Sequence, residues 1–132
     1  MKIVVTTSGD DLSGSVEPRF GRCSRFIIVD TETMEYEIVQ NTAVNSAHGA
    51  GIAAAQLVAS LGAKAVLTGN VGPKAYTALS ATGIQIVTGV SGAVEDIVKR
   101  FSSGEYQSTR GPTVGGHFGT GGRSRGGGKR QR

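Results

Sequence analysis

Residues 49–87 read GAGIAAAQLVASLGAKAVLTGNVGPKAYTALSATGIQIV, and this stretch decides the fold because helix-like and strand-like segments alternate along it. The expected elements are a helix over 49–61, a strand over 65–67, a helix over 73–79 and a strand over 84–87. Gly62 and Gly83 are placed to end the two helices, and Pro73 suits a first helical turn. Such alternation favours parallel strands that are joined by helical crossovers.

The N-terminal third adds three strands. Residues 2–7, KIVVTT, form a short β-branched run that is typical of a buried strand. Residues 26–29 are apolar, and in residues 34–38 apolar and acidic side chains alternate with period two. The pattern predicts an antiparallel hairpin with a half-exposed outer strand, on whose solvent face Glu35 and Glu37 discourage pairing with another sheet.

A last helix is indicated after the final strand. The apolar residues between 94 and 101 have the i, i+3, i+4, i+7 spacing of a buried helix face, and Ser91 or Gly92 can cap the helix. The sequence therefore predicts one α/β domain over residues 1–103. Its sheet is five-stranded and mixed, with an antiparallel hairpin strand, and three helices flank it.

Residues 104–132 have a different composition. They hold ten of the chain's 21 glycines and almost no large apolar side chain, so burial cannot offset the entropy lost on ordering. We expect a disordered tail. The tail is also basic, because its net charge is +5 whereas that of residues 1–103 is −1.

Membrane and disulfide classes are disfavoured. The chain has no charged N-terminal region followed by an apolar run, and no apolar stretch approaches the ~18 residues of a bilayer span. We expect a cytoplasmic protein with no membrane partner. Cys23 is the only cysteine, which excludes an internal disulfide and a CxxC metal site. A metal site would need other donors, a preassembled cluster, or a second copy of the chain in a homodimer.

Three loops are expected at the carboxyl ends of the parallel strands, where ligands of open α/β sheets collect. Glycine lets backbone N–H groups approach a ligand, and the helix N-termini that follow two of the loops favour negative charge. The site therefore suits an anion. The candidate binding residues in the three loops are Arg19, Phe20, Gly21, Arg22, Asn45, Gly49, Gly51, Gly69, Asn70, Gly72 and Lys74.

Two metal donors lie in the same loops, Cys23 and His48, and they indicate a metal-containing anionic guest. Each has another interpretation. His48 at a helix start can be a solvated capping residue, and Cys23 beside an apolar strand can be a small buried hydrophobe. The turn at residues 69–72 can be tight strand-to-helix geometry alone.

The segments EPRFGRC (17–23), HGAG (48–51) and GNVGPKA (69–75), in this order and spacing, resemble the dinitrogenase iron-molybdenum cofactor biosynthesis family over roughly residues 1–100. The resemblance implies a ribonuclease H-like fold and a role in binding or ferrying iron, molybdenum or related metal–sulfur clusters. It also implies that His48 is the usual candidate ligand and that Cys23 is the candidate thiolate.

We therefore expect non-catalytic binding, carriage or storage of an anionic metal–sulfur cluster, exchanged with donor or acceptor proteins. The alternative is a nucleic-acid or partner-binding module that acts through the Arg/Gly tail, which also holds His117. That alternative ranks lower because the folded part is slightly acidic and has no aromatic motif for base stacking. Enzymatic hydrolysis is disfavoured because the first strand carries no carboxylate and Pro73 removes a phosphate-binding amide.

Overall fold

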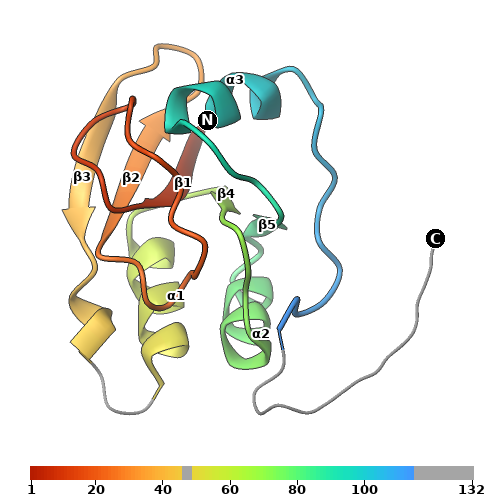
Figure 1. Cartoon of the computed structure of the whole chain (residues 1–132). Coiled ribbons are helices and arrows are strands. Elements are labelled where there is room, and N and C mark those ends of the chain that lie inside the picture. Colours follow the sequence, from red (N-terminus) through yellow and green to blue (C-terminus); the bar gives the residue numbers. More distant parts are fainter. Residues whose placement is uncertain (46–48, 115–132) are drawn as a thin grey trace.

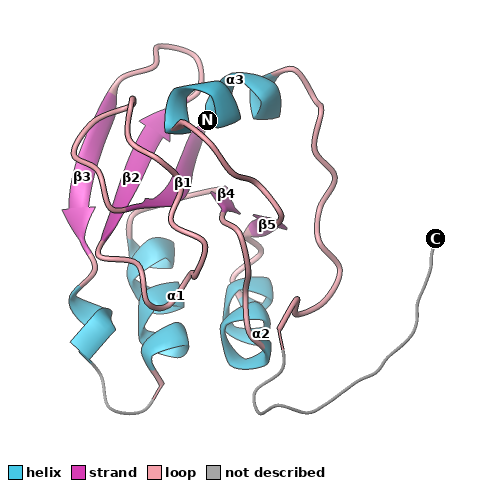
Figure 2. Ribbon diagram, viewed as in Figure 1, coloured by secondary structure: helices cyan, strands magenta, loops and turns pink. Residues whose placement is uncertain are grey.

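A five-stranded mixed sheet with the strand order β3-β2-β1-β4-β5 forms the middle layer of the domain (Figures 1 and 2). The computed structural model describes residues 1–45 and 49–114. The strands are β1 (Lys2–Thr7), β2 (Arg25–Asp30), β3 (Tyr36–Gln40), β4 (Ala65–Leu67) and β5 (Gln85–Val87). β4 is parallel to β1 and β5, and β2 is antiparallel to β1 and β3. The expected mixed sheet with a hairpin strand is confirmed.

Helices cover both faces of this sheet. They are α1 (Ala50–Ser60), α2 (Pro73–Ala81) and α3 (Val94–Ser102), and the 3-10 helix η1 (Thr42–Asn45) follows β3. Side chains alternate along β1, so that Val4 packs in the core beneath α1 and α2, whereas Ile3 and Val5 pack in the core beneath α3. No helix in the described part of the chain is long and apolar enough to cross a membrane.

The start of α3 differs from the expectation. Neither Ser91 nor Gly92 caps it, and the N-cap residue is Ala93. The amides of Val94 and Glu95 instead donate to the carbonyls of Gly14 and Leu12, at 2.8 and 2.9 Å. Backbone carbonyls from a distant loop thus replace a local side-chain cap, which a sequence pattern cannot reveal.

The outer strand of the hairpin also begins later than expected, at Tyr36 rather than Met34. Met34 has a φ of 63° and donates its amide to the Asp30 carbonyl at 2.8 Å, so it belongs to the turn. Within β3, Ile38 packs toward the α3 side and Val39 toward the α1 side. Both faces of this edge strand are partly covered.

Residues 105–114, which we call the C-terminal strap, run from the end of α3 along β5 to the first turn of α2 (Figure 1). Thr109 donates its amide to the Ile86 carbonyl at 2.6 Å, and the Thr109 hydroxyl accepts the Thr88 amide at 3.0 Å. Tyr106 packs partly against the α3-side core. Disorder from residue 104 is therefore wrong for residues 104–114, because these hydrogen bonds and this packing hold them. The remainder of the expected tail, 115–132, lies outside the described residues.

Candidate functional site

The first turns of α1 and α2 lie side by side at one end of the domain, together with the loop that contains Gly21 (Figure 1). A Cβ atom placed on Gly51 would lie 3.1 Å from the Cβ of Ala75. A Cβ atom placed on Gly21 would lie 3.0 Å from the Cα of Gly51. The three loops that the sequence singled out thus meet, and we call this surface, formed by residues 18–22, 49–51 and 69–75, the helix-start site.

Backbone hydrogen bonds fasten the first loop to the third. Asn70 donates its amide to the Pro18 carbonyl at 2.7 Å, and Phe20 donates its amide to the Asn70 carbonyl at 3.2 Å. Gly69 lies so close that an added Cβ would be 2.7 Å from the Pro18 carbonyl oxygen. The glycine at this position is required by close approach of two backbones.

Phe20 is a core residue. Its side chain is 2% exposed and its ring centroid lies 5.7 Å from that of Phe26. The prediction that Phe20 contacts a ligand is therefore wrong for its side chain in this conformation. The ring holds the loop against the core, and the loop backbone faces the helix-start site.

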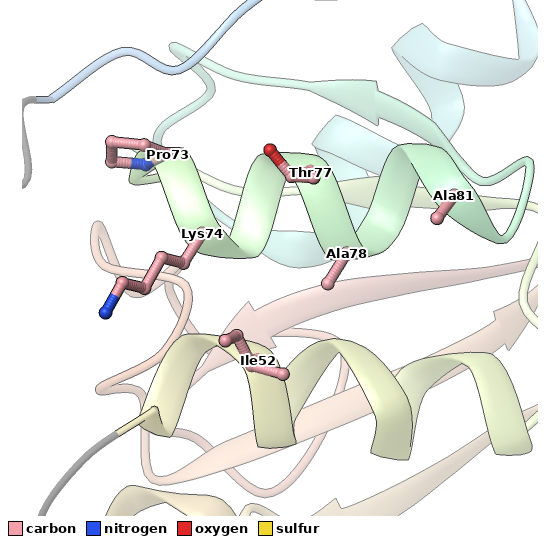
Figure 3. A pocket seen from close by; sticks show the side chains of 6 residues that line it. All are labelled: Ile52, Pro73, Lys74, Thr77, Ala78 and Ala81. Atoms are coloured by element: carbon pink, nitrogen blue, oxygen red, sulfur yellow. The ribbon is translucent and has the colours of Figure 1, made fainter.

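Three cationic side chains lie at the helix-start site and are exposed: Arg19, Arg22 and Lys74. One Nη atom of Arg22 donates to the Val44 carbonyl at 3.3 Å, which leaves the rest of the guanidinium available. Figure 3 shows Lys74 pointing from α2 toward the α1 side of the groove between these helices. An anion at this surface would meet positive charge from two directions.

The helix starts supply further positive potential. Among the described residues, no side chain caps α1 or α2, whose N-cap residues are Gly49 and Gly72. Gly49 has a φ of 75°, which glycine adopts without strain. Because Pro73 has no N–H group, the first α2 amides that can bind a ligand are those of Lys74 and Ala75. Two converging helix dipoles favour an anion at the point where they meet.

Cys23 is not at this surface. Its side chain is 0% exposed within the core beneath α1 and α2, and its Sγ atom donates to the Phe20 carbonyl at 3.2 Å. Loss of solvation on burial raises the pKa of the thiol to about 12, although a hydrogen bond from Asn41 opposes the shift. The thiol stays protonated at neutral pH, so the structure favours the buried-hydrophobe interpretation over metal ligation.

His48 lies outside the described residues, as do His117 and the basic residues of 123–132. The structure gives only the backbone of Asn45, as the last residue of η1. In residues 1–45 and 49–114, no group of three or more His, Cys, Asp or Glu side chains lies together. The described part of the site is therefore suited to holding an anion by amides and cations rather than to coordinating a metal ion through several side chains.

Asn41 is a site-building residue that the sequence reasoning missed. It is buried, and its Nδ2 atom donates to the carbonyl of Cys23 at 2.8 Å and to that of Gly21 at 3.4 Å. Its Oδ1 atom accepts the Ala43 amide at 3.1 Å. An Asn that follows a strand and closes a turn onto its own backbone is the sequence signal that could have found it.

An apolar groove of about 380 Å³ between α1 and α2 adjoins the helix-start site (Figure 3). Its lining residues are Ile52, Pro73, Lys74, Thr77, Ala78 and Ala81. Ile52, which is 37% exposed, shares the solvent-facing stripe of α1 with Gln56 and Ser60. The sequence predicted the two polar members of this stripe but not the isoleucine.

Comparison with known proteins identifies the family. The family model described as dinitrogenase iron-molybdenum cofactor matches residues 1–104. The chain belongs to the dinitrogenase iron-molybdenum cofactor family. Since the match ends at residue 104, the C-terminal strap lies beyond the part that defines the family.

Individual members of the dinitrogenase iron-molybdenum cofactor family agree. The chain is 45% identical to the orange protein from Desulfovibrio gigas, solved in its apo form, with a TM-score of 0.83 over 85% of this chain and 95% of that one. It is 34% identical to a Thermotoga protein described as a candidate NifB protein, with a TM-score of 0.70 over 81% and 91%. An uncharacterized protein from Methanocaldococcus jannaschii is 36% identical over 110 residues, covering 81% of this chain and 90% of that one.

Proposed function

We propose that this protein binds and carries an anionic metal–sulfur cluster at the helix-start site. The observation that carries the proposal is the convergence of two helix N-termini, free of described side-chain caps, with Arg19, Arg22 and Lys74. Sulfide-bearing clusters with a net negative charge match this donor-rich surface. The family supports the same cargo by its description, and the apo form of the orange protein implies that this relative also has a cofactor-bound form.

The cargo would be held mainly by charge and by backbone donors. The amides of Lys74 and Ala75 are candidate donors at the start of α2, and the exposed cations can follow the outline of the cluster. His48, which precedes Gly49 in the sequence, stays the proposed metal ligand. Cys23 is left out of this proposal because it is buried with a protonated thiol.

Carriage or storage suits this surface better than catalysis. The described residues include no clustered carboxylates of the kind that two-metal hydrolases need. We further propose that the cluster is exchanged with donor and acceptor proteins in the cytoplasm. The strand order β3-β2-β1-β4-β5 supports a ribonuclease H-like classification of the fold.

The test is anaerobic titration of the purified full chain with tetrathiomolybdate, followed by visible absorption and metal content. Lys74→Gln should weaken binding about tenfold, which corresponds to ~1.4 kcal/mol, because it removes a charge at the helix-start site. Lys64→Gln is the matched control, since Lys64 is an exposed lysine at the opposite end of β4. Absence of binding to the wild type, or an equal loss in the two variants, would contradict the proposal.

A further inference from the structure

The C-terminal strap ends at the helix-start site. Thr113 donates its amide to the Val71 carbonyl at 2.8 Å, and Val114 donates to the same carbonyl at 3.4 Å. A Cβ atom placed on Gly72, the N-cap of α2, would lie 3.9 Å from a methyl carbon of Val114. Whatever follows residue 114 therefore starts at the rim of the site (Figure 1).

The residues that follow carry nearly all of the chain's uncompensated positive charge. Residues 115–132 contain five Lys or Arg and no Asp or Glu, whereas residues 1–114 contain nine Lys or Arg and ten Asp or Glu. The tethered segment thus has a charge of +5 and the domain a charge of −1. A slightly acidic domain repels an anion at long range, and the local cations of the site act only within about a Debye length of ~8 Å.

We propose that the strap presents the basic segment 115–132 to the helix-start site, where its five cations attract the anionic cargo and speed its binding. This inference rests on the proposed function. Arg123 is nine residues beyond Val114, so its backbone can reach points up to about 30 Å away, which includes the whole site. Electrostatic attraction of this kind raises association rates by ~10- to 1,000-fold and falls steeply with ionic strength.

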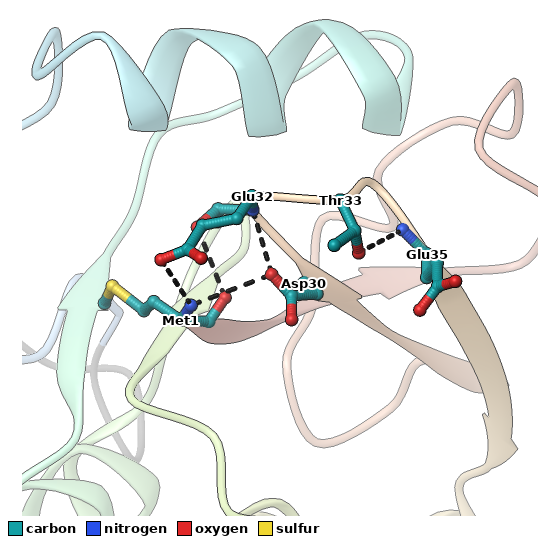
Figure 4. Close-up of polar contacts among 6 residues, drawn as sticks. Met1, Asp30, Glu32, Thr33 and Glu35 are labelled. Atoms are coloured by element: carbon teal, nitrogen blue, oxygen red, sulfur yellow. Dashed lines mark hydrogen bonds and ion pairs between the residues drawn. The ribbon is translucent and has the colours of Figure 1, made fainter.

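The position of the tether matters as much as its charge. Met1 lies at the amino end of β1, and this end of the sheet is opposite the carboxyl ends that lead to the helix-start site (Figure 1). Its amine is 3.7 Å from an Asp30 carboxylate oxygen and 3.8 Å from a Glu32 carboxylate oxygen, both exposed (Figure 4). The same basic segment attached there would have the same net charge but would start beside carboxylates and away from the site.

The experiment measures the rate of tetrathiomolybdate binding by stopped-flow absorption, at about 0.02 M and about 0.5 M NaCl. The first variant replaces the five cations of the segment by glutamine at residues 123, 125, 129, 130 and 132. We expect a rate about tenfold lower than that of the full chain at low salt, and a difference below about twofold at high salt. An unchanged rate and an unchanged salt dependence would overturn the inference.

The second variant moves residues 115–132 to a position ahead of Met1. It should bind as slowly as the glutamine variant. A rate equal to that of the wild type would show that net charge alone acts, and would overturn the role of the strap. A segment that changes binding of a single-stranded RNA oligonucleotide but not of tetrathiomolybdate would also contradict the inference. If the wild type takes up no tetrathiomolybdate at either salt concentration, the proposed function fails first; if it binds and the variants match it, only the inference fails.

Discussion

The Thr113 hydroxyl oxygen accepts a 2.8 Å hydrogen bond from the amide of Val71, a residue 42 positions earlier in the chain, while the Thr113 amide donates at 2.8 Å to the Val71 carbonyl. Both backbone groups of Val71 are therefore satisfied by one residue of the C-terminal strap. The loop that leads into α2 is held on this side by Thr113, and on the other side by Pro18 and Phe20.

Thr113→Val should lower the free energy of unfolding by about 1–2 kcal/mol, because it removes the acceptor of the partly buried Val71 amide. Urea denaturation followed by circular dichroism measures this change. Thr77→Val, at an exposed position on α2, is the control and should change stability by less than about 0.5 kcal/mol. Equal effects of the two substitutions would mean that the strap bond contributes nothing.

Gly69→Ala should destabilise the domain by about 1–3 kcal/mol, since the new methyl group would lie 2.7 Å from the Pro18 carbonyl oxygen and 2.8 Å from the Pro18 Cα atom. Both neighbours are backbone atoms and cannot rotate away. Gly111→Ala is the matched control, because a Cβ atom there meets nothing within 4 Å. The difference in thermal midpoint between the two variants tests the close approach, and similar midpoints would refute it.

The Cys23 thiol should resist modification in the native protein. Burial raises its pKa to about 12, so almost no thiolate is present at pH 8, and the sulfur is shielded by the core. A disulfide reagent such as Ellman's reagent should react slowly with the folded chain and rapidly in denaturant. Fast reaction without denaturant would show that the thiol is accessible.

The raised pKa of Cys23 also has a consequence for stability. A group whose folded pKa exceeds its unfolded value contributes fully below the unfolded pKa and loses this contribution as pH rises toward the folded value. Stability should therefore decline between about pH 9 and pH 12 in the wild type more than in Cys23→Ala. Cys23→Ala should retain cluster binding once folded, and loss of binding by this variant would return Cys23 to the list of ligands.

Asp30 predicts a pH dependence at the acidic end. The Glu32 amide donates to an Asp30 carboxylate oxygen at 2.9 Å, and this bond, with the nearby N-terminal amine, lowers the pKa of the carboxyl. The stabilisation is present above the unfolded pKa and is lost as pH falls through the folded pKa. Asp30→Asn should thus be less stable than the wild type at pH 7 and equal to it below about pH 2, with the exposed Asp10→Asn as control. A difference that persists at low pH would contradict this assignment.

Local patterns were enough to predict the elements of the domain. Period-two alternation, helical spacing and the glycines after α1 and α2 describe what each segment does with its own neighbours, and the observed β1, β4 and α1 fall within one residue of their predicted ranges. Burial of apolar faces dominates the choice of these elements, and apolar faces are visible in the order of residues.

The roles of individual side chains at the site were less visible. Phe20 and Cys23 stand in a loop motif that suggested ligand contacts, and the structure buries both. Asn41 and Thr113 attracted no attention, and they hold the two loops of the site. A loop residue faces the core or the solvent according to which distant segment packs on it, and no local period encodes that choice.

The sequence by itself determined the α/β class, the mixed sheet, the family and the separation of charge between domain and tail, because composition and periodicity act through near neighbours. Only the tertiary structure decided that α1 and α2 start side by side, that the Cys23 thiol is buried, and that the strap brings the basic segment to the site. These facts depend on contacts between residues tens of positions apart, whose energies are set by packing and by hydrogen bonds that exist only after the chain has folded.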